Sequence, residues 1–136
     1  MTKIESDKVH ISHSPEAIFN FLGDFNNFEK LMPKEVTLWK STHDECSFKI
    51  GGMAHLGMKI IEKKPFELIR IAKNGEAPFD FFLNCLIKES EQGTEVQLAF
   101  DAELNPMMKM MAVKPLTNFL NLLVQKMKDL PWNPNA

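Results

Sequence analysis

The stretch 93-GTEVQLAFDAELNPMMKMM-111 contains the change of hydrophobic period that decides the fold. From Val96 to Leu104 every second residue is apolar, which indicates a strand with one buried face. Asn105 and Pro106 then suit the cap and the first position of a helix. Beyond them the apolar residues recur with a period of about 3.6. This stretch therefore predicts a strand that leads directly into a long C-terminal helix.

Before this stretch, short apolar-rich segments alternate with turn residues such as Gly, Pro, Asn and Asp. Because the connections are short, neighbouring segments should pair antiparallel as a meander. The predicted strands of the meander are 35–42, 45–51, 54–63, 66–73, 79–89 and 94–104.

The N-terminal part of the chain predicts a further strand and two short helices. Residues 3–11 form the strand, in which Val9 and Ile11 alternate with polar neighbours. Ser14 and Pro15 then suit the start of a helix. A second short helix follows at 27–31, before a proline. The whole chain thus predicts an α+β fold with seven antiparallel strands in the order β-α-α-β6-α.

The composition suits one soluble domain. The chain has 136 residues, of which 44% are hydrophobic and 25% charged, with a net charge of −2. We expect a single domain over 1–136, with a core at about 3–130 and a flexible tail at 131–136. No basic block stands out, so we expect no nucleic-acid partner.

The sequence shows neither a signal peptide nor an apolar run of membrane-spanning length. We therefore expect a cytoplasmic protein without stable membrane insertion. Cys46 and Cys85 are isolated, so we expect buried thiols rather than a disulfide.

Three segments resemble the START/Bet v 1-like superfamily, also called SRPBCC or polyketide cyclase/dehydrase-like. They are VHISHSPEAIFNFLGDFNNFEKLMP (9–33), GTEVQLAFDAEL (93–104), and the helix that runs from NPMMKMM (105–111) to Leu130. The resemblance implies a helix-grip fold, in which a curved antiparallel sheet wraps around a long C-terminal helix and leaves a cavity between them. Members of the superfamily bind lipids, sterols, polyketides and plant hormones, some are cyclases or dehydratases, and relatives include chaperone activators.

An apolar cavity is the site that this fold predicts. Four methionines, at 107, 108, 110 and 111, lie where the long helix begins, and methionine adapts to irregular shapes. Met108 and Met111 best continue the apolar stripe of the helix, whereas exposure of Met107 or Met110 would indicate a lid or a contact patch. The predicted lining is Phe48, Ile50, Met58, Ile60, Ile69, Phe81, Leu83, Val96, Leu98, Phe100, Met108, Met111, Phe119 and Leu123. Ordinary core filling explains each of these residues equally well.

Few residues suggest chemistry. His55 would suit a general acid or base and Arg70 would suit a carboxylate anchor, but the strand pattern turns both outward. His10 and His13 lack further ligands at metal-site spacing, so we expect no metal. No phosphate-binding or dinucleotide motif is present, so we expect no cofactor.

Three functions follow from these observations. The first is non-enzymatic binding or transport of a hydrophobic small molecule, such as a lipid or a polyketide-like compound, by a monomer or homodimer. The second is a cyclase/dehydratase-type enzyme that uses His55 or Arg70 in the same cavity. The third is a partner-binding module like the chaperone-activating relatives, which an exposed apolar patch would support.

Overall fold

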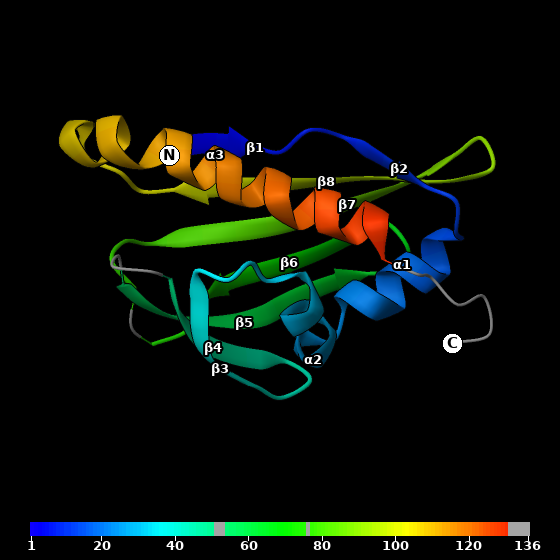
Figure 1. Cartoon of the computed structure of the whole chain (residues 1–136), viewed down its shortest axis with the longest axis horizontal. Coiled ribbons are helices and arrows are strands. Elements are labelled where there is room, and N and C mark those ends of the chain that lie inside the picture. The colour runs from blue at the N-terminus through cyan, green and yellow to red at the C-terminus, as the bar shows by residue number, and fades with distance from the viewer. Residues whose placement is uncertain (51–53, 76, 131–136) are drawn as a thin grey trace.

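The computed structural model describes residues 1–50, 54–75 and 77–130, and Figure 1 shows a sheet with one long helix across its face. The N-terminal elements are β1 (Thr2–Glu5), β2 (Val9–Ile11), α1 (Pro15–Leu22), α2 (Phe25–Phe28) and the single 3-10 turn η1 (Glu29–Leu31). The meander follows as β3 (Val36–Ser41), β4 (Glu45–Ile50), β5 (Ala54–Lys64), β6 (Leu68–Lys73), β7 (Phe81–Ser90) and β8 (Gly93–Ala102). The long helix is α3 (Pro106–Asp129). The predicted α+β helix-grip architecture is confirmed.

The sheet is antiparallel throughout and has the order β1-β8-β7-β6-β5-β4-β3, with β2 also paired to β8. Consecutive strands from β3 to β8 are therefore neighbours, as the short connections predict. The N-terminal strands add to the far side of β8, with Thr2 opposite Ala102 and Val9 opposite Val96.

Two elements differ from the prediction. The helix predicted at 27–31 is α2 followed by the 3-10 turn η1, and the first strand is divided. Residues 3–11 do not form one strand, because the chain leaves the ladder between β1 and β2, which makes eight strands instead of seven. The buried residue Ser6 causes this break. Its backbone N–H donates to the carbonyl of Leu98, and its hydroxyl accepts from the N–H of Leu98, each at 2.9 Å. The hydroxyl oxygen of Ser6 thus takes the place of a backbone carbonyl as acceptor, and β1 and β2 both stay paired with β8.

The inward-facing side chains of the strands form one half of the core. In β7 the buried residues are Phe81, Leu83, Cys85 and Ile87, and the residues between them are more exposed. In β8 Thr94, Val96, Leu98, Phe100 and Ala102 are buried, and Ala99 between two of them is buried as well. Thr94 is a buried polar residue, and its hydroxyl donates to the carbonyl of His13 at 2.6 Å. This bond ties the start of β8 to the segment that leads into α1.

The other half of the core comes from the helices. Asn105 caps α3 by accepting from the N–H of Met108 at 2.8 Å, as the sequence predicts. The helix continues through Pro115 and buries one side, formed by Ala112, Leu116, Leu120, Leu123, Val124 and Met127. Ser14 caps α1 by accepting from the N–H of Ala17 at 3.2 Å. The connection between the predicted strands 45–51 and 54–63 and the tail at 131–136 lie outside the described residues.

Candidate functional site: an apolar pocket between the sheet and α3

A pocket lies between the sheet and α3, and its volume is about 50 Å³. Every side chain around it is apolar, and no polar atom contributes to its surface. The lining residues are Phe28, Met32, Phe48, Ile50, Leu56, Met58, Pro78, Phe79, Phe81, Leu83, Phe100, Leu116, Phe119, Leu120 and Leu123. Such a site excludes water and offers only shape and dispersion contacts to a ligand.

Helical and strand periods bring this lining together. Leu116, Phe119, Leu120 and Leu123 follow the spacing i, i+3, i+4, i+7, which places all four on one side of α3. The sheet contributes inward residues of β4, β5, β7 and β8, which alternate with outward residues. The segment around α2 and η1 adds Phe28 and Met32.

Aromatic rings form much of the wall. Phe81 and Phe100 stack with centroids 5.0 Å apart, and the ring of Phe79 meets both of them edge-on at 6.2 Å. The neighbouring strands β3 and β4 add the stack of Trp39 on Phe48, with centroids 5.2 Å apart. These contacts fix the ring planes, so the aromatic wall is the rigid part of the pocket.

Eight of the fourteen residues predicted for the lining surround the pocket in the structure. They are Phe48, Ile50, Met58, Phe81, Leu83, Phe100, Phe119 and Leu123. Ile69, Val96 and Leu98 are buried elsewhere in the sheet, and Ile60 is half-buried on β5. These four residues pack in the core or against it, outside the pocket.

The interpretation of the methionines is corrected by the structure. Met111 does not face the sheet, because 72% of its surface is exposed, and Met108 is half-buried outside the pocket. The inward side of α3 runs through Met108 and Ala112 to Leu116, at intervals of four residues. Residue 111 lies about 100° away from residue 112 around the helix. The methionine cluster is therefore not the wall of the cavity.

Seven lining residues were not predicted. Leu56, Leu116 and Leu120 belong to the alternating or helical apolar sets, so the sequence carried a signal for them. Phe79 begins the predicted strand 79–89 and alternates with Phe81 and Leu83, so the sequence carried a signal for it too. Phe28, Met32 and Pro78 lie in short helices or connections, where no period distinguishes inward from outward. The complete set is Phe28, Met32, Leu56, Pro78, Phe79, Leu116 and Leu120.

His55 and Arg70 both lie away from the pocket. His55 is exposed on β5, opposite Lys49 of β4. Arg70 is on the outer face of the sheet, where its guanidinium lies 4.3 Å from the centroid of the Phe82 ring. A cation over an aromatic ring is a stabilising contact that requires no ligand. Neither residue can reach a molecule bound between the sheet and α3.

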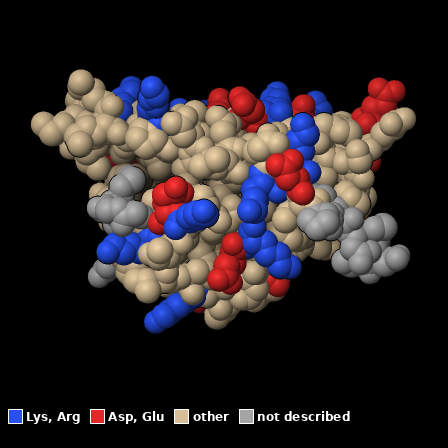
Figure 2. Space-filling view, viewed as in Figure 1, with Lys and Arg blue, Asp and Glu red and all other residues tan. Residues whose placement is uncertain are grey.

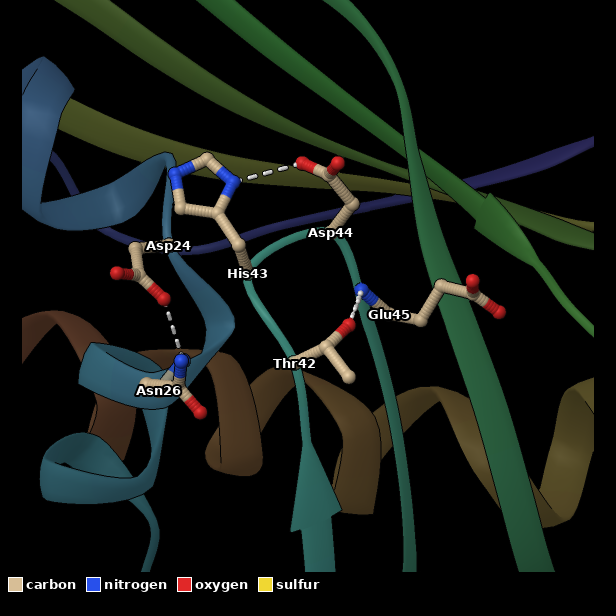
Figure 3. A network of polar contacts seen from close by, with 6 residues as sticks. All are labelled: Asp24, Asn26, Thr42, His43, Asp44 and Glu45. Carbon is tan, nitrogen blue, oxygen red and sulfur yellow. Dashed lines mark hydrogen bonds and ion pairs between the residues drawn. The ribbon is translucent and has the colours of Figure 1, made fainter.

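The turn between β3 and β4 holds a group of polar side chains, which Figure 3 shows at close range. His43 Nδ1 lies 2.8 Å from Asp44 Oδ1, and the hydroxyl of Thr42 accepts from the N–H of Glu45 at 3.2 Å. The carbonyl of His43 accepts from the N–H of Phe25 at 3.0 Å. These contacts shape the turn and attach it to α2, and the side chains of His43 and Asp44 are mostly exposed. Ordinary turn geometry accounts for these polar contacts.

Other chemistry is also limited in the described part of the chain. No group of three or more His, Cys, Asp or Glu side chains there could hold a metal ion. Cys46 and Cys85 are free and buried, and burial raises the pKa of each thiol to about 12. A backbone hydrogen bond with Met58 opposes this rise at Cys46. Thiols held in the neutral form are poor nucleophiles.

Comparisons with known proteins agree on the fold. No protein-family model matches the sequence, and no curated protein matches it. Among solved structures, XoxI from Bacillus cereus is 17% identical with a TM-score of 0.72, covering 98% of this chain and 100% of its own. The Aha1 dimer from Colwellia psychrerythraea is 17% identical with a TM-score of 0.66, covering 100% of both chains. TTHA0849 from Thermus thermophilus is 13% identical with a TM-score of 0.70, covering 94% of this chain and 95% of its own.

These similarities extend over almost the whole length of each chain, and the TM-scores establish a common fold. The chain has the START/Bet v 1-like fold that the sequence resemblance predicts. No helix among the described residues is long and apolar enough to cross a membrane.

Proposed function

We propose that the protein binds an apolar small molecule, or the apolar part of an amphiphilic one, between the sheet and α3. The observation that carries this proposal is the uninterrupted apolar lining of the pocket, to which the sheet, α3 and the α2–η1 segment all contribute. Burial of apolar ligand surface against such a lining supplies about 25 cal/mol per Å².

The lining also selects among ligands. A polar group in the pocket would lose its hydrogen bonds with water and find none in exchange, which costs about 1–3 kcal/mol for each group. A saturated acyl chain or an unsubstituted ring avoids this cost. A polyketide-like compound with many oxygen atoms fits less well, so the pocket favours the lipid-like class of the two that the sequence suggests.

The volume of the pocket limits the size of the ligand. About 50 Å³ accommodates a small alkyl or aryl group, whereas pockets for whole drug-sized ligands measure about 300–1,000 Å³. A longer chain therefore requires side chains of the lining to move. Met32 and Met58 are suited to this because methionine changes rotamer easily, and half-buried Met32 lies at the edge of the pocket.

The cyclase/dehydratase alternative lacks support in the described residues. It requires at least one polar group that points into the cavity, and the pocket has none. The partner-binding alternative keeps a specific observation in its favour, which is the exposure of Met107 and Met110 on α3. Homodimer formation belongs to that alternative.

Native mass spectrometry tests the proposal. Protein purified gently from its natural source should carry a reproducible extra mass, and solvent extraction should release an apolar compound. A titration with cis-parinaric acid, whose fluorescence rises in apolar surroundings, should give saturable binding at one site. A clean protein mass together with no saturable parinarate binding would contradict the proposal.

A further inference from the structure

The solvent-facing side of α3 is unusually apolar at its first turns. Met107, Met110 and Met111 are 72%, 87% and 72% exposed. Residues 107, 110, 111 and 114 follow the spacing i, i+3, i+4, i+7, so the three methionines and Lys114 share one side of the helix. That side is opposite the one that lines the pocket.

The same side stays partly apolar along the helix. Asn118 and Leu122 continue it, and Leu122 is 53% exposed. From Met107 to Leu122 the stripe is about 22 Å long at 1.5 Å per residue. Figure 1 shows that the first turns of α3 project beyond the strands, and Figure 2 shows this end as an uncharged knob with basic side chains at its base.

The charge on α3 differs from that of the chain. The helix has four lysines, and its only acidic residue is Asp129 at its C-terminal end, so it carries +3 whereas the chain as a whole carries −2. All four lysines, at 109, 114, 126 and 128, are exposed. The nearest acidic residue before the helix is Glu103, which is also exposed. Successive residues are about 100° apart, so Lys114 and Lys128 lie on the side of the methionines and Lys109 lies on the opposite side. The exposed side of α3 therefore combines apolar side chains with two lysines. Its acidic neighbours are Asp129 at the C-terminal end and Asp7, which donates its N–H to Asn121 Oδ1 at 2.7 Å.

We propose that this side of α3 docks on the surface of an anionic lipid membrane. A basic amphipathic helix lies in the plane of such a surface, with its apolar side chains among the acyl chains and its lysines among the headgroups. A second copy of the chain fits less well, because a symmetric contact through α3 would bring its lysines against those of the partner. Methionine also suits a surface without fixed shape, since its side chain adapts to what it meets.

This inference does not depend on the ligand pocket, because it rests on the opposite side of the helix. The proposed docking side and the pocket lie on opposite sides of α3. Leu116, Phe119, Leu120 and Leu123 line the pocket from α3, so a docked helix would separate the lipid surface from the pocket by about one helix diameter, 10–12 Å.

Vesicle co-sedimentation of the full chain tests the inference, with vesicles of phosphatidylcholine alone and of an equal mixture with phosphatidylglycerol. We expect binding to the anionic vesicles that weakens with added salt, and little binding to the neutral ones. Replacement of Met107, Met110 and Met111 by serine should weaken binding about tenfold or more. Replacement of Lys114 and Lys128 by glutamine should weaken it about fivefold for each lysine.

Matched variants control for general effects of exposed residues. Leu38→Ser removes an apolar side chain that is 66% exposed on β3, and Lys40→Gln with Lys88→Gln removes two exposed strand lysines. Both should bind vesicles like the unmodified protein. Since every substituted side chain is exposed, the thermal unfolding temperature should change little in each variant. If the methionine variant nevertheless fails to fold, vesicle binding by the variant with the two α3 lysines replaced tests the inference.

Three results would overturn the inference. They are equal binding to neutral and anionic vesicles, no vesicle binding at all, and full binding by either helix variant. A mass that doubles with concentration in sedimentation equilibrium without lipid, and that returns to the monomer value in the methionine variant, would assign this side of α3 to a second copy instead.

Discussion

The indole ring of Trp39 lies against the ring of Phe48, with centroids 5.2 Å apart and planes inclined by 25°. Phe48 lines the pocket, whereas Trp39 does not. The indole Nε1 is buried and has no hydrogen-bond partner among the described residues. Trp39 therefore contacts the pocket only through Phe48, so its environment can change on ligand binding without direct contact between the indole and the bound molecule.

This relationship predicts that tryptophan fluorescence will detect ligand binding. The chain has two tryptophans, so Trp132→Phe leaves Trp39 as the single probe. A molecule that enters the pocket contacts Phe48 and shifts its stack with Trp39, so we expect a saturable change in emission. The midpoint should match that of the cis-parinaric acid titration. Parinarate binding with unchanged Trp39 emission would place the ligand away from Phe48.

A larger side chain in the pocket should block binding. Leu56 lines the pocket on β5 and Ile60 lies on the same strand outside the lining, and both are half-buried. We expect Leu56→Trp to weaken parinarate binding about tenfold or more, a loss of about 1.4 kcal/mol in binding free energy. Ile60→Trp is the matched control and should bind normally. Each variant should lose about 1–3 kcal/mol of stability at most, because both sites border on solvent. Equal effects of the two variants on binding would show that the molecule binds elsewhere.

The parts of the structure with a strong period were predictable from the sequence. Alternation from Val96 onward identified β8, and Asn105 with Pro106 identified the start of α3. Where the apolar residues of a helix fit more than one stripe, the sequence did not determine which side of the helix is buried. Four methionines within five residues allow more than one apolar stripe, and packing selected the one through Ala112, whose small side chain is buried on the inward side of α3.

The remaining differences have local causes. Met32 follows the short turn η1, so no period predicted that it would reach the pocket. The first strand divides at Ser6 because a hydroxyl can take the place of a backbone acceptor, which depends on a neighbour that is 92 residues away in the chain. Long-range contacts of this kind are not visible in a single sequence.

The close approach of β5 to the end of β6 predicts a strict requirement for glycine at position 57. A Cβ atom there would lie 1.9 Å from the carbonyl oxygen of Asn74, and Asn74 donates its N–H to the Gly57 carbonyl at 2.9 Å. Because Gly57 lies between the lining residues Leu56 and Met58, displacing it also disturbs the pocket. We expect Gly57→Ala to destabilise the protein by about 2–3 kcal/mol in urea unfolding.

Gly75→Ala is the matched control for that variant. Gly75 has a positive φ of 79°, and a Cβ atom there would meet nothing within 4 Å. Its substitution should cost only the backbone strain, about 1 kcal/mol. Similar losses for the two variants would show that β5 and Asn74 are not held at this distance in solution.

The buried thiols predict a loss of stability at alkaline pH. Cys46 and Cys85 are 6% and 0% exposed, and burial raises both pKa values from 9.0 to about 12. Above pH 9 the unfolded chain releases these protons while the folded chain retains them, so the free energy of unfolding falls as pH rises from about 9 to about 12. By pH 10 we expect a loss of about 1 kcal/mol for each cysteine. The chain contains no tyrosine, so no phenol ionises in the same range.

Urea unfolding at pH 7, 9 and 10 measures this effect, with Cys85→Val as the variant that removes one thiol and keeps an apolar side chain of similar size. The variant should unfold at pH 7 within about 1.5 kcal/mol of the unmodified protein. It should also lose about half as much stability between pH 9 and 10, since only Cys46 still titrates. A thiol reagent at pH 8 should react with neither cysteine until urea unfolds the chain. Rapid reaction without urea, or an alkaline loss that is the same in the variant, would mean that Cys85 is not held neutral in the folded core.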